Sequence, residues 1–106
     1  MALGNFLYIN VWKEIQMYNY ILCFIFNENT SHHNLYDAIA SLGDYFQVLD
    51  SVWILISESD SVSIKDKLVT YIGNEDMFFI SKLSMPADAA WLNLSPDVTD
   101  WLKSKM

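Results

Sequence analysis

The sequence predicts an α+β domain in which two helices pack on one face of a four-stranded antiparallel sheet, in the chain order β-α-β-β-α-β. Two observations support this prediction. The block from Ser41 to Ser57, SLGDYFQVLDSVWILIS, ends a helix at a glycine and continues as two strands joined by a short turn. That hairpin lies between two segments with helical spacing, and a further strand-like segment lies outside each of them.

The first strand is predicted at Tyr20–Phe26, which is apolar on both faces, as in a strand that is central or covered on both sides. Thr30 or Ser31 is expected to cap the helix that follows. The buried stripe of that helix comprises Leu35, Ala38, Ile39 and Leu42. Gly43 is expected to end the helix in the left-handed conformation.

The hairpin consists of Tyr45–Leu49 and Val52–Ile56, whose aromatic and β-branched residues suit a half-buried sheet. Its turn, Asp50–Ser51, is not one of the common two-residue types, so the sequence leaves the strand register open.

A second helix and a fourth strand follow the hairpin. Ser61 or Ser63 is expected to cap the helix. Its buried stripe comprises Ile64, Leu68, Tyr71 and Ile72. Gly73 is expected to end it, before a strand at Met77–Leu83.

The tail adds two predicted elements. Ala89–Leu94 is expected to form a fifth, short strand around Trp91. Ser95, Pro96 and Asp97 then give a capping residue, a proline at the first helical position and an acid in the first turn of a closing helix. The buried stripe of that helix comprises Val98, Trp101 and Leu102.

Together these elements predict one domain at residues 17–106, a ferredoxin-like α/β sandwich with an extra C-terminal strand and a short helix. One face of its sheet has no helices. Because 53% of the 106 residues are hydrophobic, the chain has apolar side chains to spare for that face. We expect two copies to cover it by packing face to face as a homodimer, and a protein partner is a further candidate for this surface.

Residues 1–16, MALGNFLYINVWKEIQ, do not continue this pattern. The codons for Lys13 and Glu14 read AAR-GAR and can contain a bacterial ribosome-binding sequence, about six nucleotides before a start codon at Met17. We therefore expect translation to begin at Met17. The alternative is an N-terminal extension whose apolar residues, Phe6, Leu7, Ile9 and Trp12, pack on the domain.

The charge argues against a general nucleic-acid binder. The net charge is −7 and the chain has no arginine, whereas nucleic-acid affinity depends on positive charge and phosphate recognition on the arginine fork. Lys65, Lys67 and Lys82 are expected to be solvated surface. The strand aromatics Tyr45, Phe46, Trp53, Phe78 and Phe79 could stack bases as on a related RNA-binding sheet, but such surfaces have basic surroundings. We expect these rings in the core and the dimer interface.

The compartment is predicted to be the cytoplasm. Cys23 is the sole cysteine, so no intrachain disulfide forms, and its apolar surroundings predict a small buried hydrophobe rather than a reactive thiol. The apolar run Tyr20–Phe26 is far shorter than the roughly 20 residues that a membrane helix needs. The N-terminus lacks the basic region of a signal peptide.

The segments YILCFIFNEN, HHNLYDAIASLG, DYFQVLDSVWILIS, AAWLNL and TDWLKSKM resemble, in this order, the SinR-like family of small bacterial proteins. The resemblance covers residues 17–106 and is most specific around Trp53 and in the terminal Trp-Leu-Lys. The family is similar in fold to the CRISPR-associated adaptation subunit two and to VapD toxins, which are ferredoxin-like dimers, some of them metal-dependent nucleases. The resemblance implies a toxin–antitoxin or mobile-element setting and a fifth strand that crosses to the partner. The dimer interface that we expect comprises Trp53, Trp91, Leu92 and Leu94.

In the nuclease relatives, an aspartate at the end of the first strand binds a divalent cation. The matching residue here is Asn27, whose neutral amide is a poorer ligand for Mg²⁺ than a carboxylate. Asn27 and Glu28 are therefore the weak candidates for a catalytic site, and Glu28 is the weak candidate for a metal ligand. Asp44 and Asp50 are the further carboxylates available to a nuclease.

His32 and His33 are the other candidate ligands. Neighbouring residues on a helix point about 100° apart, so the two do not form a natural chelating pair. Pairs of Glu28 with His32, or of His33 with Asp37, have better geometry. A zinc site needs three or four ligands, and the chain has no third histidine. We expect both histidines to be exposed near a helix cap.

The sequence thus predicts a non-enzymatic, homodimeric interaction module that acts through protein contacts and holds no cofactor. Two alternatives stay open. The first is a metal-dependent endonuclease with a degenerate site, which would use Mg²⁺ and Glu28, Asp44 or Asp50. The second is a nucleic-acid-binding regulator.

Overall fold

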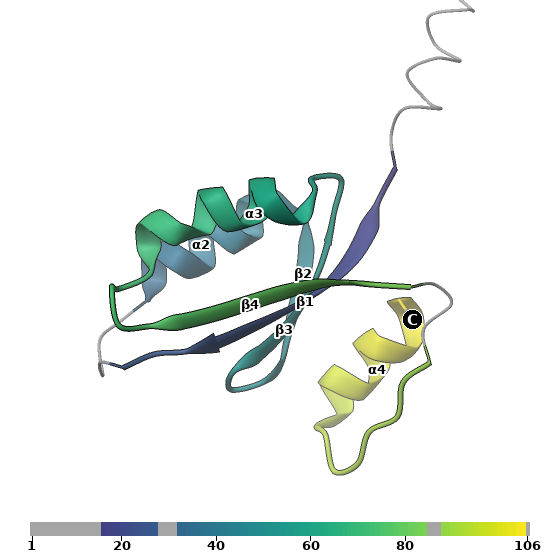
Figure 1. Cartoon of the computed structure of the whole chain (residues 1–106). Helices are drawn as coiled ribbons and strands as arrows, with labels where there is room; N and C mark the ends of the chain where they lie inside the picture. The colour runs from purple at the N-terminus through teal and green to yellow at the C-terminus, as the bar shows by residue number, and fades with distance from the viewer. Residues whose placement is uncertain (1–15, 28–31, 85–87, 106) are drawn as a thin grey trace, which may run out of the picture.

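Four strands form one antiparallel sheet in the spatial order β2-β3-β1-β4 (Figure 1). The computed structural model describes residues 16–27, 32–84 and 88–105. Its strands are β1 (Tyr18–Ile25), β2 (Asp44–Leu49), β3 (Val52–Ser57) and β4 (Met77–Leu83). Its helices are α2 (His33–Leu42), α3 (Ser61–Leu68) and α4 (Pro96–Lys105), and a 3₁₀ turn, η1 (Val69–Tyr71), follows α3. The predicted α+β class and its four strands are confirmed.

Helices α2 and α3 lie side by side over one face of the sheet, and α4 lies on the other face (Figure 1). The main core fills the space between the sheet and the helix pair. From β1 it receives Tyr20, Leu22 and Phe24, none of which is more than 1% exposed. Because β1 pairs with β3 on one side and β4 on the other, it is the central strand that its apolar run predicts.

The hairpin between β2 and β3 contains a register shift. Leu49 pairs with Val52 across the turn, and an irregularity lies between Gln47 and Leu49. The Gln47 side-chain Nε2 donates a hydrogen bond to the carbonyl oxygen of Asp50 at 3.1 Å. The turn residues alone did not predict this irregularity. A bulge changes which side chains of the two strands face each other.

Both ends of α2 differ from the prediction. The predicted caps Thr30 and Ser31 lie outside the described residues, and the cap position is held by His32, which makes no capping bond with its side chain. Gly43 ends the helix, but its backbone is extended (φ 161°, ψ −163°) rather than left-handed. Glycine is needed for a different reason: a Cβ at this position would collide with the backbone carbonyl oxygen of Ile56 on β3.

The residue that caps α3 lies before both of the predicted caps. The Asp60 Oδ1 accepts a hydrogen bond from the backbone N–H of Ser63 at 2.8 Å, so Asp60 is the cap and the prediction of Ser61 or Ser63 is wrong. The α-helix then changes to η1. Tyr71, the last residue of η1, is 43% exposed rather than buried as predicted, whereas Ile72 packs against the main core.

Helix α4 begins where the sequence predicts. The Ser95 Oγ accepts a hydrogen bond from the backbone N–H of Val98 at 3.3 Å. Val98 and Leu102 are 8% and 5% exposed, and they form a second, smaller core with Ile54 on the face of the sheet opposite to α2 and α3. The prediction of a bare sheet face is therefore wrong in part, because the chain covers some of that face with its own closing helix.

The predicted fifth strand at residues 89–94 is not formed in the single chain. These residues are irregular, and Asn93 has a φ of 62°, in the left-handed region that interrupts an extended strand. The predicted N-terminal extension, residues 1–16, lies outside the described part of the chain apart from Gln16.

Within the described residues, no helix is long and apolar enough to cross a membrane.

Candidate functional site

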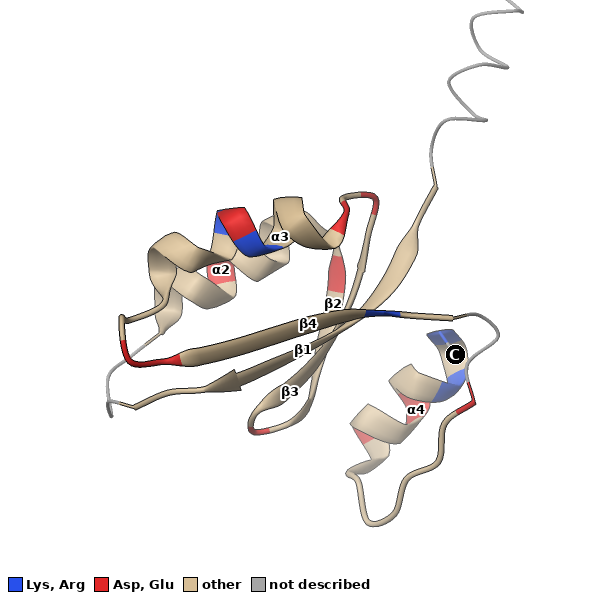
Figure 2. Cartoon of the chain, viewed as in Figure 1, with Lys and Arg blue, Asp and Glu red and all other residues tan. Residues whose placement is uncertain are grey.

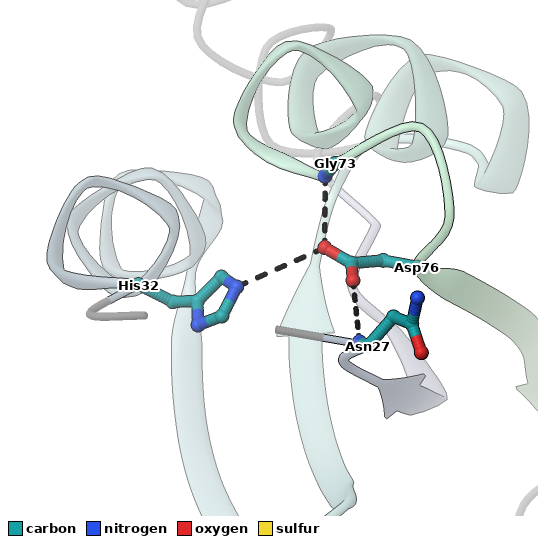
Figure 3. A network of polar contacts seen from close by, with 4 residues as sticks. All are labelled: Asn27, His32, Gly73 and Asp76. Carbon is teal, nitrogen blue, oxygen red and sulfur yellow. Dashed lines mark hydrogen bonds and ion pairs between the residues drawn. The ribbon is translucent and has the colours of Figure 1, made fainter. Parts of the chain in front are cut away.

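The polar groups at the end of β1 converge on one carboxylate, that of Asp76 (Figure 3). Its Oδ1 accepts a hydrogen bond from the backbone N–H of Asn27 at 2.7 Å, and its Oδ2 accepts one from the backbone N–H of Gly73 at 2.8 Å. The same Oδ2 lies 3.8 Å from the Nε2 of His32. Asp76 therefore joins three segments: the end of β1, the start of α2 and the turn that leads into β4.

This carboxylate is held in its charged form. Its side chain is only 6% exposed, which by itself would raise its pKa. The hydrogen bonds from the backbone of Asn27 and Gly73 outweigh that effect and, together with the nearby His32, lower the pKa of Asp76 below its ordinary value. Because its oxygens are already engaged by three groups of the chain, Asp76 acts as a structural link.

The two histidines have different environments. His32 stacks on Phe26, with 3.7 Å between ring centroids, and its side chain is 10% exposed. The prediction of an exposed histidine is wrong here, because the chain turns into α2 just after His32 and brings the ring back over the end of β1. His33 is 80% exposed, as predicted, and its Nε2 lies 3.4 Å from the Oδ2 of Asp37, one helical turn away.

Asn27 lies between two acids that the sequence analysis did not select. Its side-chain Nδ2 donates a hydrogen bond to the Oε2 of Glu75 at 2.6 Å, while its backbone bonds to Asp76. These acids are 48 and 49 residues further along the chain, so no local spacing relates them to Asn27. The only signal in the sequence is that the acids immediately precede β4, the strand that pairs with β1.

The other predicted carboxylates do not gather at this site. Glu28 lies outside the described residues. Asp44 begins β2 at the opposite end of the sheet from Asn27, and its Oδ2 lies 3.1 Å from the Nζ of Lys105. Asp50 lies in the β2–β3 turn and is exposed. Within the described residues, no group of three or more His, Cys, Asp or Glu side chains is placed to hold a metal ion.

The residues predicted for a dimer interface are divided between the core and the surface. Trp53 is 4% exposed and packs in the main core, where its ring lies 5.1 Å from Tyr36 and 5.7 Å from Tyr45. Its own subunit thus buries the ring that we expected to meet a partner. Trp91 is 36% exposed and Leu92 82%, whereas Leu94 packs against the second core.

A cluster of exposed apolar side chains lies at one end of the sheet. Ile25, Met77 and Phe79 are each 58–60% exposed. Ile25 pairs with Met77, and Phe79 pairs with the half-buried Cys23. Because neighbouring β1 side chains Leu22 and Phe24 point toward α2 and α3, strand alternation directs this cluster to the opposite face, and we call it the open patch.

Helix α4 covers that opposite face only at its other end, where Ile21 and Leu83 contact the second core. Figure 2 shows charged residues on the helices, the turns and the start of β2, whereas β1 carries none and β4 carries only Lys82. The open patch is therefore an uncharged apolar surface beside the polar network of Asp76.

A scan against models of known protein families finds no match to this sequence, and a search of curated proteins finds none either.

Proposed function

We propose that this protein is a homodimeric interaction module with ferredoxin-like topology, related to the SinR-like family, that acts through protein contacts rather than through catalysis. The strand order β2-β3-β1-β4 with two helices on one face supports the topology. The open patch is the observation that carries the functional part of the proposal. Three large apolar side chains on two paired strands, each more than half exposed, are typical of a contact surface.

A two-fold axis through this face would bring the open patch of one copy against the same patch of the other. Such a closed pair is the commonest form of homo-oligomer, because one self-complementary surface satisfies both subunits. The absence of charges on β1 removes a source of repulsion that a chain of net charge −7 would otherwise bring to the contact.

The tail supplies a second proposed contact. Leu92 is 82% exposed beside Trp91, and residues 89–94 make no strand within their own chain. In the proposed dimer, this segment gains a pairing partner from the other subunit, as the family resemblance suggests. The resemblance also underlies the proposed setting, a bacterial toxin–antitoxin system or mobile element in the cytoplasm.

The mass in solution tests the dimer. The mass of the wild-type protein, measured by sedimentation, is expected to be about twice the 12.3 kDa of one chain. Phe79→Asp is expected to have the mass of a monomer, because it places a charge in the patch. Val62→Asp is the matched control, since Val62 is also 60% exposed but lies on α3, on the other layer. A monomeric wild type, or a Phe79→Asp protein that remains dimeric, would contradict the proposal.

A metal-dependent endonuclease is the second candidate, and the position of Glu75 and Asp76 beside Asn27 is the observation that favours it. Under this alternative, Mg²⁺ or Mn²⁺ would support cleavage of RNA or DNA that EDTA abolishes, and Asn27→Asp would increase the rate by adding a carboxylate ligand. Glu75→Gln would decrease it. Under our main proposal the purified protein shows no EDTA-sensitive cleavage. Nucleic-acid binding that weakens steeply with salt would instead support the regulator.

A further inference from the structure

The second core contains a cavity of about 470 Å³ between the sheet and the irregular segment that precedes α4. Its lining includes Ile21 and Ile54 of the sheet, Trp91 and Leu94 of the irregular segment, and Leu102 of α4. The lining is otherwise apolar apart from Ser84 and Asp88. This cavity lies on the same face of the sheet as the open patch and next to it, because Val52 of the lining pairs with Cys23, which pairs with Phe79 of the patch.

The size of the cavity suits a small molecule. A space of about 470 Å³ falls in the range of small-molecule sites, roughly 300–1,000 Å³. Its apolar walls suit a hydrocarbon body, because water gains few hydrogen bonds there.

The single charge in the described lining, at the exposed Asp88, selects the kind of ligand. Asp88 is the one charged residue among the described lining residues, and it forms no ion pair within the described part of the chain. The carboxylate of a fatty acid would meet a like charge there, whereas an ammonium group would meet an opposite one. The net charge of −7 also raises the local concentration of cations. The Trp91 ring, 36% exposed, offers an aromatic face to such a cation.

We propose that this cavity binds an amphiphilic organic cation, that is, a molecule with a single ammonium group and an alkyl or arylalkyl body. The body lies between Ile54 and Leu102, and the ammonium group lies at the opening beside Asp88. Residues 89–94 contribute to this lining and also to the proposed dimer contact, so binding is measured in the monomeric Phe79→Asp background as well as in the wild-type chain.

Alkylamines of increasing length test the site in the full-length chain by calorimetry and by tryptophan fluorescence. Hexylamine, octylamine and decylamine are used at neutral pH, below their aggregation thresholds. Each added methylene is expected to tighten binding about three- to four-fold as it enters the apolar space. Octanol is expected to bind up to about five-fold more weakly than octylamine, because it lacks the exposed ion pair. Octanoate is expected to bind more weakly still.

Three variants locate the ligand. Ala90→Phe fills the cavity with a ring and is expected to abolish octylamine binding, since Ala90 lies in the lining. Val69→Phe adds a comparable ring on the 3₁₀ turn outside the cavity, where Val69 is 52% exposed, and is expected to leave binding unchanged. Asp88→Asn is expected to remove the difference between octylamine and octanol while retaining the dependence on chain length.

Several results would overturn the proposal. They are the absence of octylamine binding to the wild-type chain, octanoate binding as tight as that of octylamine, or unchanged octylamine binding by a folded Ala90→Phe protein. The melting temperature of each variant without ligand shows whether it is folded, so a loss of binding can be separated from a loss of structure.

Discussion

Asn27 and Asp76 are joined by a 2.7 Å hydrogen bond from the backbone N–H of the first to the Oδ1 of the second. This bond connects the segment just after β1 to the turn that precedes β4, the neighbour of β1 in the sheet. The Oδ2 of the same carboxylate accepts a hydrogen bond from the backbone N–H of Gly73, so Asp76 also holds the two ends of its own turn together. Asn27 thus takes part in a structural network at the end of β1.

Asp76→Asn tests whether this network stabilises the fold. The hydrogen bonds lower the pKa of Asp76 in the folded state from its ordinary value of 3.8, so the folded chain binds the proton more weakly than the unfolded chain. The stabilisation is therefore fully present above pH 3.8 and is lost as the pH falls through the lower folded value. We expect Asp76→Asn to lower the melting temperature at neutral pH and to flatten its decline in acid.

The matched control is Asp50→Asn, which removes an exposed acid from the hairpin turn. Thermal melts of the three proteins across the acidic range provide the measurement. Parallel pH profiles for wild type and Asp76→Asn would contradict the assigned role of Asp76.

The stacking of His32 on Phe26 gives a second prediction. His32→Ala removes a ring that is 10% exposed and 3.7 Å from its aromatic neighbour, so we expect a loss of about 1–3 kcal/mol in the free energy of unfolding. His33→Ala, at a side chain that is 80% exposed, is expected to change it by less than about 0.5 kcal/mol. Urea denaturation measures both. Equal effects of the two substitutions would show that the stack contributes nothing.

A third prediction concerns the close approach of α2 to β3. Gly43→Ala would place a Cβ against the carbonyl oxygen of Ile56, and only a backbone shift can relieve that contact. We expect a loss of about 1–3 kcal/mol or more in the free energy of unfolding. Gly73→Ala is expected to cost less, since its Cβ would lie 3.0 Å from the Oδ2 of Asp76, a side-chain atom that can move. A Gly43→Ala protein as stable as wild type would refute this account.

The second core gives a fourth prediction. Leu102→Ala removes a side chain that is 5% exposed and packs with Val98 and Ile54, and we expect it to cost about 2–5 kcal/mol in the free energy of unfolding. Leu92→Ala is the control, because Leu92 is 82% exposed, and its effect in the monomer is expected to be below about 0.5 kcal/mol. Chemical denaturation of a monomeric background, Phe79→Asp, separates this effect from any change in dimerisation. If Leu102→Ala behaves like Leu92→Ala there, then α4 does not contribute to the stability of the sheet.

The sequence by itself determined the four strands and three α-helices of the described residues and their order, but not the irregular conformation of residues 89–94. Met77–Leu83 is a strand with the predicted bounds, and the closing helix begins at Pro96, as the cap-proline-acid pattern indicates. The buried stripe of α2 likewise contains Leu35, Ala38 and Ile39. Such features depend on propensities, capping and the alternation of apolar residues, all of which act between neighbours in the chain.

Only the tertiary structure decided where the elements and their side chains meet. It places α4 on the second face of the sheet, buries Trp53 beneath α2, and brings His32 and Asn27 to Asp76. It also shows that Gly43 is needed for a close backbone approach rather than for a left-handed turn. Each of these relationships joins residues that are distant in sequence, and it exists because the sheet brings strand ends together and a small core must be filled. No local pattern specifies which distant partner a side chain will find.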